Sequence, residues 1–382
     1  MTANEPSLPL SGTTVVEIGT SVSAPYAGWV LAGLGADVIK IENPNAGDDA
    51  RQWGRMFPDG RSSFFLAINA NKRSVTVNMK DPDDLAWLQD FCASRADVVL
   101  QNMRPGKIAE FGLDAAAMIA RNKRLIYCNM GAFGAVGPES NKPGYDPLMQ
   151  ACGGIMSVTG EPERPPVRVG VSIVDMGTGM WSAIGILGAL IHRQKSGEGC
   201  VIDSSLYETS VAWVANQAAM VQVDGRNPEK VGSGARGMAP YQAYNCADGY
   251  LVVSAPNDRL FKRLANALEH PEWLKDERFA SNQSRYSNLS DLNTQLEPVL
   301  ASNTREHWMR VLDKAGVPCA PVRQVSEMLE NEQTKALGML QSIQGESPPL
   351  LGMPLSFDGV RPPLRTMPPA LGQHTGELKQ EQ

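Results

Sequence analysis

The 382-residue sequence has little of the chemistry that marks several large classes of protein. Its four histidines and six cysteines all stand alone, with no C-x-x-C pair, so the sequence predicts no metal site. Single cysteines in a chain of this length are typical of free, buried thiols in a reducing compartment. The net charge of −6 is mild and argues against a nucleic-acid partner, because nucleic acid favours a basic surface.

The sequence also lacks the apolar segments of membrane and secreted proteins. No uninterrupted apolar stretch reaches the length of a membrane span. Residues 1–10 have neither the basic start nor the apolar stretch of a signal peptide. We therefore expect a cytoplasmic protein with no membrane partner. A content of 42% apolar and 20% charged residues indicates a globular fold, and the length predicts two domains.

Strand and helix patterns alternate over the first 223 residues. The opening predicts two parallel strands, Thr13–Ile18 and Ala36–Glu42, joined by a helix that begins near Pro25 and ends near Leu34. Further strands are predicted at Ser74–Met79, Asp97–Leu100, Arg124–Asn129, Val167–Val174 and Cys200–Ser204, with helices at 82–95, 178–192 and 206–223. This alternation predicts an α/β fold with a Rossmann-like parallel sheet.

From about Asp224 the pattern changes. Residues 225–237 are rich in glycine, asparagine and charge, which is typical of a linker between domains. The segments Tyr241–Cys246 and Gly249–Ser254 flank a short turn and predict a β-hairpin. Helical patterns follow as far as Asp313.

Asp175 is the most informative single residue, because it ends a predicted strand and precedes a predicted helix. Ligands of open α/β sheets bind outside the carboxyl ends of strands, and a helix N-terminus stabilises an ionised carboxylate. Gly177 and Gly179 are expected to let a bulky ligand approach the backbone. From the residues alone, a simple helix cap is the alternative role for Asp175, and the more frequent one.

The loop Gly19–Ala24 does not match G-x-G-x-x-G, which removes the main support for a nicotinamide-dependent oxidoreductase. Glu42 is accordingly interpreted as an acidic strand end rather than a ribose ligand. Lys72, Arg73 and Arg104 stand beside predicted strands, where cations suit phosphate groups. Each of them can equally be a solvated surface charge.

Eight runs in the same order resemble the family III CoA-transferases, the group of formyl-CoA transferase and carnitine CoA-transferase. The runs are Ser23–Gly28, Leu34–Glu42, Asn71–Lys80, Asn102–Gly106, Pro143–Asp146, Gly153–Gly160, Asp175 and Leu371–Thr375. The resemblance implies a Rossmann-like large domain built from both chain ends, a smaller α+β domain and an interlocked homodimer. The corresponding boundaries are 1–223 for the first part of the large domain, 224–238 for the linker, 239–320 for the small domain and 321–382 for the returning segment.

In such enzymes an aspartate at the position of Asp175 attacks the thioester and forms an aspartyl anhydride, then an aspartyl-CoA thioester. The resemblance implies acyl-CoA and carboxylic acid substrates, with coenzyme A as substrate and product, and neither a permanently bound cofactor nor a metal. It places Tyr145 and Asp146 near the reacting centre. Contacts with CoA are implied for Val22, Ser23, Asn43, Val77, Asn78, Met79, Lys80, Asn102, Met103 and Arg104.

The chain departs from the resemblance at two positions. Many of the similar enzymes carry arginine where this sequence has Asn43 and Glu110, so recognition of the phosphates is expected to rest on Arg104 and Lys80. The loop Gly232–Gly237 is the nearest candidate for the glycine-rich loop that covers the aspartate in formyl-CoA transferase.

The runs Gly234–Gln242 and Asp248–Val253 look most like the succinate–hydroxymethylglutarate branch, which indicates a short dicarboxylic donor such as succinyl-CoA. Arg236 is a hypothesis for the distal carboxylate, with a linker charge as its alternative. Two other functions stay open. An α-methylacyl-CoA racemase shares the aspartate but looks to have histidine where this chain has Tyr145. The second alternative function is that of a catalytically silent CoA-binding subunit, although the presence of Asp175 argues against it.

Overall fold

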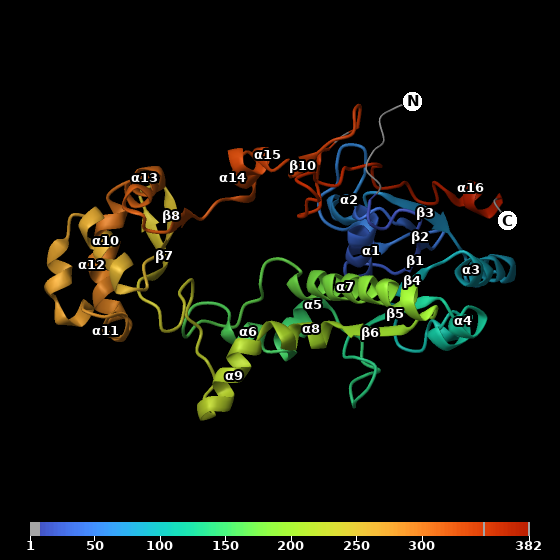
Figure 1. Ribbon diagram of the computed structural model, residues 1–382, viewed down its shortest axis with the longest axis horizontal. Coiled ribbons are helices and arrows are strands. Elements are labelled where there is room, and N and C mark those ends of the chain that lie inside the picture. Colours follow the sequence, from blue (N-terminus) through green and yellow to red (C-terminus); the bar gives the residue numbers. More distant parts are fainter. Residues whose placement is uncertain (1–7, 347, 381–382) are drawn as a thin grey trace. The chain divides into compact units, whose positions relative to one another are not determined.

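The computed structural model describes residues 8–346 and 348–380, so most of the N-terminal segment 1–10 considered above lies outside the described residues. The chain divides into two compact units (Figure 1). Unit 1 comprises Met1–Ile155, Arg168–Arg226 and Glu332–Gln382, and unit 2 comprises Met156–Val167 and Asn227–Asn331.

Unit 1 is built on a six-stranded parallel sheet with the order β3-β2-β1-β4-β5-β6. The strands are β1 (Thr14–Ile18), β2 (Asp37–Glu42), β3 (Lys72–Thr76), β4 (Val98–Gln101), β5 (Ile126–Gly131) and β6 (Val201–Ser205). Most residues of β1 to β5 are buried, as expected for parallel strands that are covered on both faces. The predicted α/β fold with a parallel sheet is confirmed.

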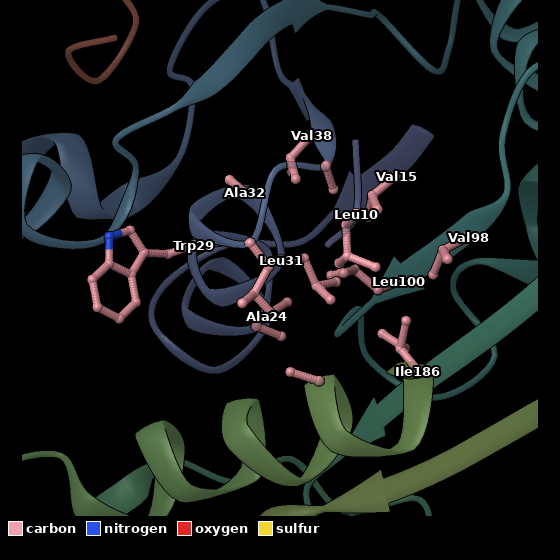
Figure 2. Packing of buried hydrophobic residues seen from close by; sticks show 14 of the residues in the cluster. Leu10, Val15, Ala24, Trp29, Leu31, Ala32, Val38, Val98, Leu100 and Ile186 are labelled. Atoms are coloured by element: carbon pink, nitrogen blue, oxygen red, sulfur yellow. The ribbon is translucent and has the colours of Figure 1, made fainter. Parts of the chain in front are cut away.

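Helices cover both faces of this sheet. On one face lie α1 (Ser23–Gly33) and α7 (Ile173–Ser196), and on the other lie α3 (Pro82–Ser94) and α4 (Ala115–Arg121). Neighbouring residues of β1 point to opposite faces, so that Val15 belongs to the first core and Val16 to the second. Figure 2 shows the first core, in which Leu31 of α1, Leu100 of β4 and Ile186 of α7 belong to one cluster.

Within the described residues, α7 is the one helix long and apolar enough to cross a membrane by length and composition. Its buried side packs against α1, β5 and β6, as expected of a core helix. An added Cβ atom at Gly179 would lie 2.8 Å from the carbonyl oxygen of Ser23, and one at Gly177 would lie 2.9 Å from the Trp213 ring. The expectation that these glycines open the backbone to a ligand is therefore wrong, because they allow α7 to pack closely on other helices.

Two predicted elements differ from the structure. Residues 167–172 form no strand, and α7 begins at Ile173, so Asp175 lies inside a helix rather than at a strand end. The N–H of Val169 donates to the side chain of Gln150, not to a neighbouring strand, and β6 pairs with β5. The long helix predicted at 206–223 is divided at Val214 into α8 (Leu206–Trp213) and α9 (Ala215–Asp224).

Unit 2 contains a three-stranded antiparallel sheet, β7-β8-β9 (Tyr241–Cys246, Gly249–Ser254 and Cys319–Pro321). The predicted hairpin is confirmed, since Cys246 pairs with Gly249 across the turn. The helices α10 (Asp258–Ala267), α11 (Asn282–Ser287), α12 (Leu289–Ala301), α13 (Arg305–Ala315) and α14 (Val325–Leu329) follow the hairpin. The units have other boundaries than those predicted: β9 pairs with β8, and unit 2 extends to Asn331 and includes residues 156–167 and 227–238.

The C-terminal segment of unit 1 lies along the outer edge of β3. His374 exchanges hydrogen bonds with the backbone of Ser74, and the Thr375 hydroxyl accepts from the N–H of Thr76 at 2.9 Å. The remaining elements of the chain are α2 (Ser63–Ile68), α5 (Asp146–Cys152), α6 (Ile155–Val158), α15 (Glu332–Ala336), β10 (Leu340–Gln341), β11 (Leu350–Leu351), α16 (Thr375–Gln380) and 3-10 helices at Asp49–Gln52, Ala109–Phe111, Pro271–Lys275 and Glu277–Phe279.

The cysteines are less buried than expected. Cys92, Cys128 and Cys246 are buried, whereas Cys200 and Cys319 are half-buried and Cys152 is exposed.

Candidate active site

A cleft of about 1090 Å³ in unit 1 is lined by the residues that follow the first five strands of the sheet. The order of the strands reverses between β1 and β4, because the chain moves outward from β1 to β3 and then returns to the other side of β1. The crevice outside the carboxyl ends of strands at such a reversal is where open α/β sheets bind ligands. The topology therefore explains the position of the cleft.

All thirteen residues predicted from the sequence line this one cleft. They are Val22, Ser23, Asn43, Val77, Asn78, Met79, Lys80, Asn102, Met103, Arg104, Tyr145, Asp146 and Asp175. They come from five loops and the starts of the three helices α1, α5 and α7, so folding brings together positions up to 153 residues apart (from 22 to 175). Their individual roles stay predictions.

The side chain of Asn102 forms hydrogen bonds with the loop after β1. Its Oδ1 atom accepts from the N–H of Thr20 at 3.0 Å, and its Nδ2 atom donates to the Thr20 carbonyl at 2.9 Å. An added Cβ atom at Gly19 would lie 2.5 Å from the Cβ of Ala24 and 3.0 Å from Asn102 Oδ1. The loop after β1 therefore needs glycine at position 19 so that Asn102 can hold it against the end of β4.

Four cationic side chains line the cleft, and they differ in their partners. Lys107 forms an ion pair with Glu110, and Lys142 forms one with Glu139. Lys80 and Arg104 have no carboxylate partner among the described residues. This difference agrees with the expectation that Lys80 and Arg104 bind the phosphates of the ligand.

The other two predicted phosphate-binding cations are not in the cleft. Lys72 is 1% exposed and forms an ion pair with Glu17, while Arg73 pairs with Asp37 and Glu377. Lys72 is therefore neither a phosphate ligand nor a solvated charge, because its ammonium group is buried in unit 1. Glu42 accepts hydrogen bonds from Arg51 and Ser74, which agrees with its interpretation as an acidic strand end.

Asp175 lies in the first turn of α7 and its side chain is half-buried. Burial, together with the charge of the nearby Asp146 carboxylate, raises the pKa of Asp175 to about 7. Within the described residues the Asp175 carboxylate accepts no hydrogen bond, so it is available to a ligand in the cleft.

Asp146 takes the capping role that Asp175 does not. Its Oδ2 atom accepts from the N–H groups of Val174 and Asp175, at 2.8 and 3.1 Å, and its Oδ1 atom accepts from Gln150. The side chain is 2% exposed and comes from the start of α5. Because these N–H groups would otherwise lack partners at the helix start, Asp146 fixes the first turn of α7 and with it the position of Asp175.

Several cleft residues were not predicted from the sequence. They are chiefly Trp53 and Phe64, whose ring centroids lie 6.0 Å apart, the backbone at Gly131 and Ala132, and the cations Lys107 and Lys142. None of these residues stands in a distinctive motif. Their proximity to the cleft follows from the course of the segments after β2, β4 and β5.

The fold and the cleft together define an α/β protein that has, at the switch point of its sheet, a carboxylate with a raised pKa and two cations without a carboxylate partner among the described residues. The family model for CoA-transferase family III matches residues 10–375, and the chain belongs to this family. It is accordingly a CoA-transferase, and the resemblance of its sequence to the family III CoA-transferases is confirmed.

Two curated relatives and one solved structure give the extent of the similarity. The chain is 34% identical to the succinate–glutarate CoA-transferase of Agrobacterium fabrum over 98% of this chain and 95% of that protein. It is 35% identical to the succinyl-CoA–D-citramalate CoA-transferase of Chloroflexus aurantiacus over 87% of this chain and 82% of that protein. The crystal structure of a CAIB/BAIF family protein from Brucella suis matches with a TM-score of 0.90 and 36% identity, over 98% of this chain and 99% of the other.

Proposed function

We propose that the protein moves CoA from a short dicarboxylic acyl-CoA, such as succinyl-CoA, to a second carboxylic acid, with Asp175 as the residue that carries the acyl group. The observation that carries this proposal is the half-buried Asp175 carboxylate in the wall of a cleft of about 1090 Å³. That volume is at the upper end for ligand sites and suits a ligand as large as a CoA thioester.

The reaction proceeds in two symmetrical halves. An Asp175 carboxylate oxygen attacks the thioester carbonyl, and the C–S bond breaks to give a mixed anhydride and CoA thiolate. The thiolate attacks the Asp175 carbonyl carbon, which releases the first carboxylate and leaves an aspartyl-CoA thioester. The acceptor carboxylate then attacks this thioester and expels the thiolate, which attacks the acceptor carbonyl and restores the free Asp175 carboxylate. One difficult transfer is thus divided into four easier steps.

The environment of Asp175 suits this role. A carboxylate with a pKa of about 7 is more basic than an ordinary aspartate, yet a large fraction of it is ionised near neutral pH. Lys80 and Arg104 provide positive charge for the phosphates of CoA elsewhere in the same cleft. The relatives named above support succinyl-CoA as donor and dicarboxylic acids as substrates. Arg236, which donates to the carbonyl of Glu229 within unit 2, stays a hypothesis for the distal carboxylate.

A racemase reaction needs a base for the α-proton of the acyl group. None of the four histidines is among the described residues that line the cleft, and position 145 carries tyrosine. Histidine titrates near neutral pH, whereas tyrosine does not. This supports acyl transfer over proton exchange.

The experiment is mass spectrometry of the full-length protein after incubation with succinyl-CoA and trapping with hydroxylamine. Hydroxylamine converts an aspartyl thioester or anhydride into a hydroxamate, which we expect on the peptide that contains Asp175. The Asp175→Ala variant should carry none. Because only the ionised carboxylate attacks, the rate of labelling should rise as the pH passes through about 7 and then level off.

A hydroxamate on another residue would refute the role of Asp175. If a panel of acyl-CoA thioesters gives no adduct, α-proton exchange in deuterated water distinguishes a racemase, which exchanges the proton, from a silent CoA-binding subunit, which does not.

We further propose that the two units act as the large and small domains of a homodimer, interlocked as the family resemblance implies. Large apolar side chains on the outer side of α7 and on α8 support a second copy as partner. Met180, Trp181, Ile184 and Trp213 are 46%, 47%, 54% and 44% exposed in the single chain. A patch of this kind is uncommon on a monomer.

A further inference from the structure

We propose that Lys40 and Asp48 form a buried clamp that holds the two loops after β1 and β2 in the shape that binds CoA. The first loop is residues 19–22 and the second loop is residues 43–48. This inference rests on the proposed function of the cleft and extends it to Lys40, a positioning residue beneath the cleft surface.

The ammonium group of Lys40 has three partners and is fully buried. It donates to Glu17 Oε1 at 2.7 Å and to the Gly19 carbonyl at 2.8 Å, and it forms an ion pair with Asp48 Oδ2 at 2.7 Å. Burial alone would lower the pKa of Lys40, but the carboxylates of Glu17 and Asp48 raise it above its ordinary value. Lys40 is therefore a fixed positive charge that connects Glu17 of β1 with both loops.

Asp48 connects the loops through the backbone. Its Oδ1 atom accepts from the N–H groups of Ser21 and Ala50, both at 2.9 Å, and its own N–H donates to Glu42 Oε2 at 3.0 Å. Ser21 has a φ of 71°, in the left-handed region that is unfavourable for a residue with a side chain. The hydrogen bond from Ser21 to Asp48 stabilises this conformation, and Asn102 holds the neighbouring Thr20 from the other side.

Both loops lead to residues that are expected to bind CoA. Val22 ends the first loop and Ser23 begins α1, while Asn43 begins the second loop, and all three line the cleft. Without the ammonium, the carbonyl of Gly19 and the Oδ2 atom of Asp48 would both lose the donor that Lys40 supplies. That arrangement is unfavourable in a buried site, so the loops would separate and the affinity for CoA would fall.

Lys72 offers a matched control. It is equally buried, and its ammonium also has three partners: Glu17 Oε2 at 2.8 Å, the Pro25 carbonyl at 2.7 Å and Asn69 Oδ1 at 2.9 Å. None of these partners lies in either loop. Removal of Lys72 therefore withdraws a similar charge from the same glutamate without releasing the loops.

The experiment is calorimetric titration of the full-length protein with CoA, beside urea unfolding, for wild type, Lys40→Met and Lys72→Met. We expect both variants to lose stability. The Kd for CoA should rise about tenfold or more in Lys40→Met and stay within about threefold of wild type in Lys72→Met. The variant Asp48→Asn keeps an acceptor for Ser21 but loses the ion pair, and its Kd should also rise. It provides the test if Lys40→Met does not fold.

The reaction gives a second readout. At saturating succinyl-CoA, the rate of hydroxamate formation should be similar in Asp48→Asn and wild type, because the clamp acts on binding rather than on Asp175. An equal rise of Kd in Lys40→Met and Lys72→Met, or an unchanged Kd in Asp48→Asn, would overturn the clamp. Wild type that binds CoA without labelling of Asp175 would refute the proposed function and leave the clamp standing. Wild type that does not bind CoA would refute both.

Discussion

At the scale of single residues, two carboxylates at the start of α7 have different surroundings. Asp146 is buried and accepts hydrogen bonds from two backbone N–H groups of the helix and from Gln150. Asp175 faces the cleft without a donor among the described residues, and the charge of Asp146 adds to burial in raising its pKa. One carboxylate thus fixes the helix start, and its charge contributes to the raised pKa of the other.

The raised pKa of Asp175 predicts a cost in stability at neutral and alkaline pH. The folded protein holds a proton on Asp175 up to about pH 7, whereas the unfolded chain releases it near 3.8. Asp175 therefore favours folding at low pH and loses this contribution as the pH rises through 7. We expect Asp175→Asn to be more stable than wild type at pH 8, by on the order of 2–4 kcal/mol, and this advantage to vanish near pH 4.

The measurement is the free energy of urea unfolding of both proteins between pH 4 and pH 8. Two curves that stay parallel over this range would show that the pKa of Asp175 is not raised by folding.

The sequence could identify residues that stand in distinctive runs, and it could not identify buried charges. Asp175 and the twelve other predicted cleft residues were found because they lie in or beside runs that resemble a known family. Lys40 alternates with Ile39 and Ile41, a pattern that normally places a lysine in solvent. Lys40 of β2 and Lys72 of β3 both pair in the interior with Glu17 of β1, and these contacts depend on the strand order β3-β2-β1.

At the scale of elements, the packing of α7 on α1 decides where Asp175 lies. Gly179 is one turn after Asp175, and an added Cβ atom would lie 2.8 Å from the Ser23 carbonyl and 3.1 Å from the Ala27 nitrogen. Both are backbone atoms of α1, which cannot move independently of the helix. A side chain at position 179 would therefore push apart the helices that carry Asp175 and Ser23.

We expect Gly179→Ala to lower stability by roughly 1–3 kcal/mol, as overpacking does, and to weaken CoA binding. The matched control is Gly185→Ala on the same helix, where the added Cβ would meet the Ile202 side chain at 3.2 Å. That side chain can shift, and alanine favours the helix, so its stability should stay within about 1 kcal/mol of wild type. Thermal unfolding and CoA titration measure both effects. Equal stability of the two variants would contradict a special role for Gly179.

Elements with a local signal were predictable, and elements that depend on distant partners were not. The hairpin turn after Cys246 and the opening strand–helix–strand unit are each determined by residues close together in the sequence. Val167–Val174 has the β-branched residues of a strand, but a strand also needs a partner, and Gln150 binds this backbone instead. The division between α8 and α9 at Val214 could not be predicted, because no glycine or proline stands at this position.

At the scale of the whole molecule, the exposed apolar side chains of α7 and α8 form one surface. Trp181 and Trp213 lie with ring centroids 6.4 Å apart, so the two helices contribute to the same patch. Burying such aromatic side chains against a second copy contributes about 25 cal/mol per Å² of apolar surface. Dimerisation would therefore be driven largely by this patch.

We expect light scattering of the purified protein to give twice the 41.2 kDa mass of one chain. Trp181→Glu should shift the mass toward that of a single chain, because it places a charge in the patch. The control is Val360→Glu, an exposed valine in the C-terminal segment, 61% exposed, which should leave the mass unchanged. A wild-type protein that stays at 41.2 kDa at micromolar concentration would exclude the homodimer.

The contact of His374 and Thr375 with β3 has a consequence for the order in which the protein is made. β3 is an edge strand of the sheet, and its free edge is covered by residues only a few positions from the C-terminus. A ribosome releases that covering segment some 300 residues after β3 itself. During that interval of synthesis the nascent sheet therefore presents an open edge, which chaperones can shield.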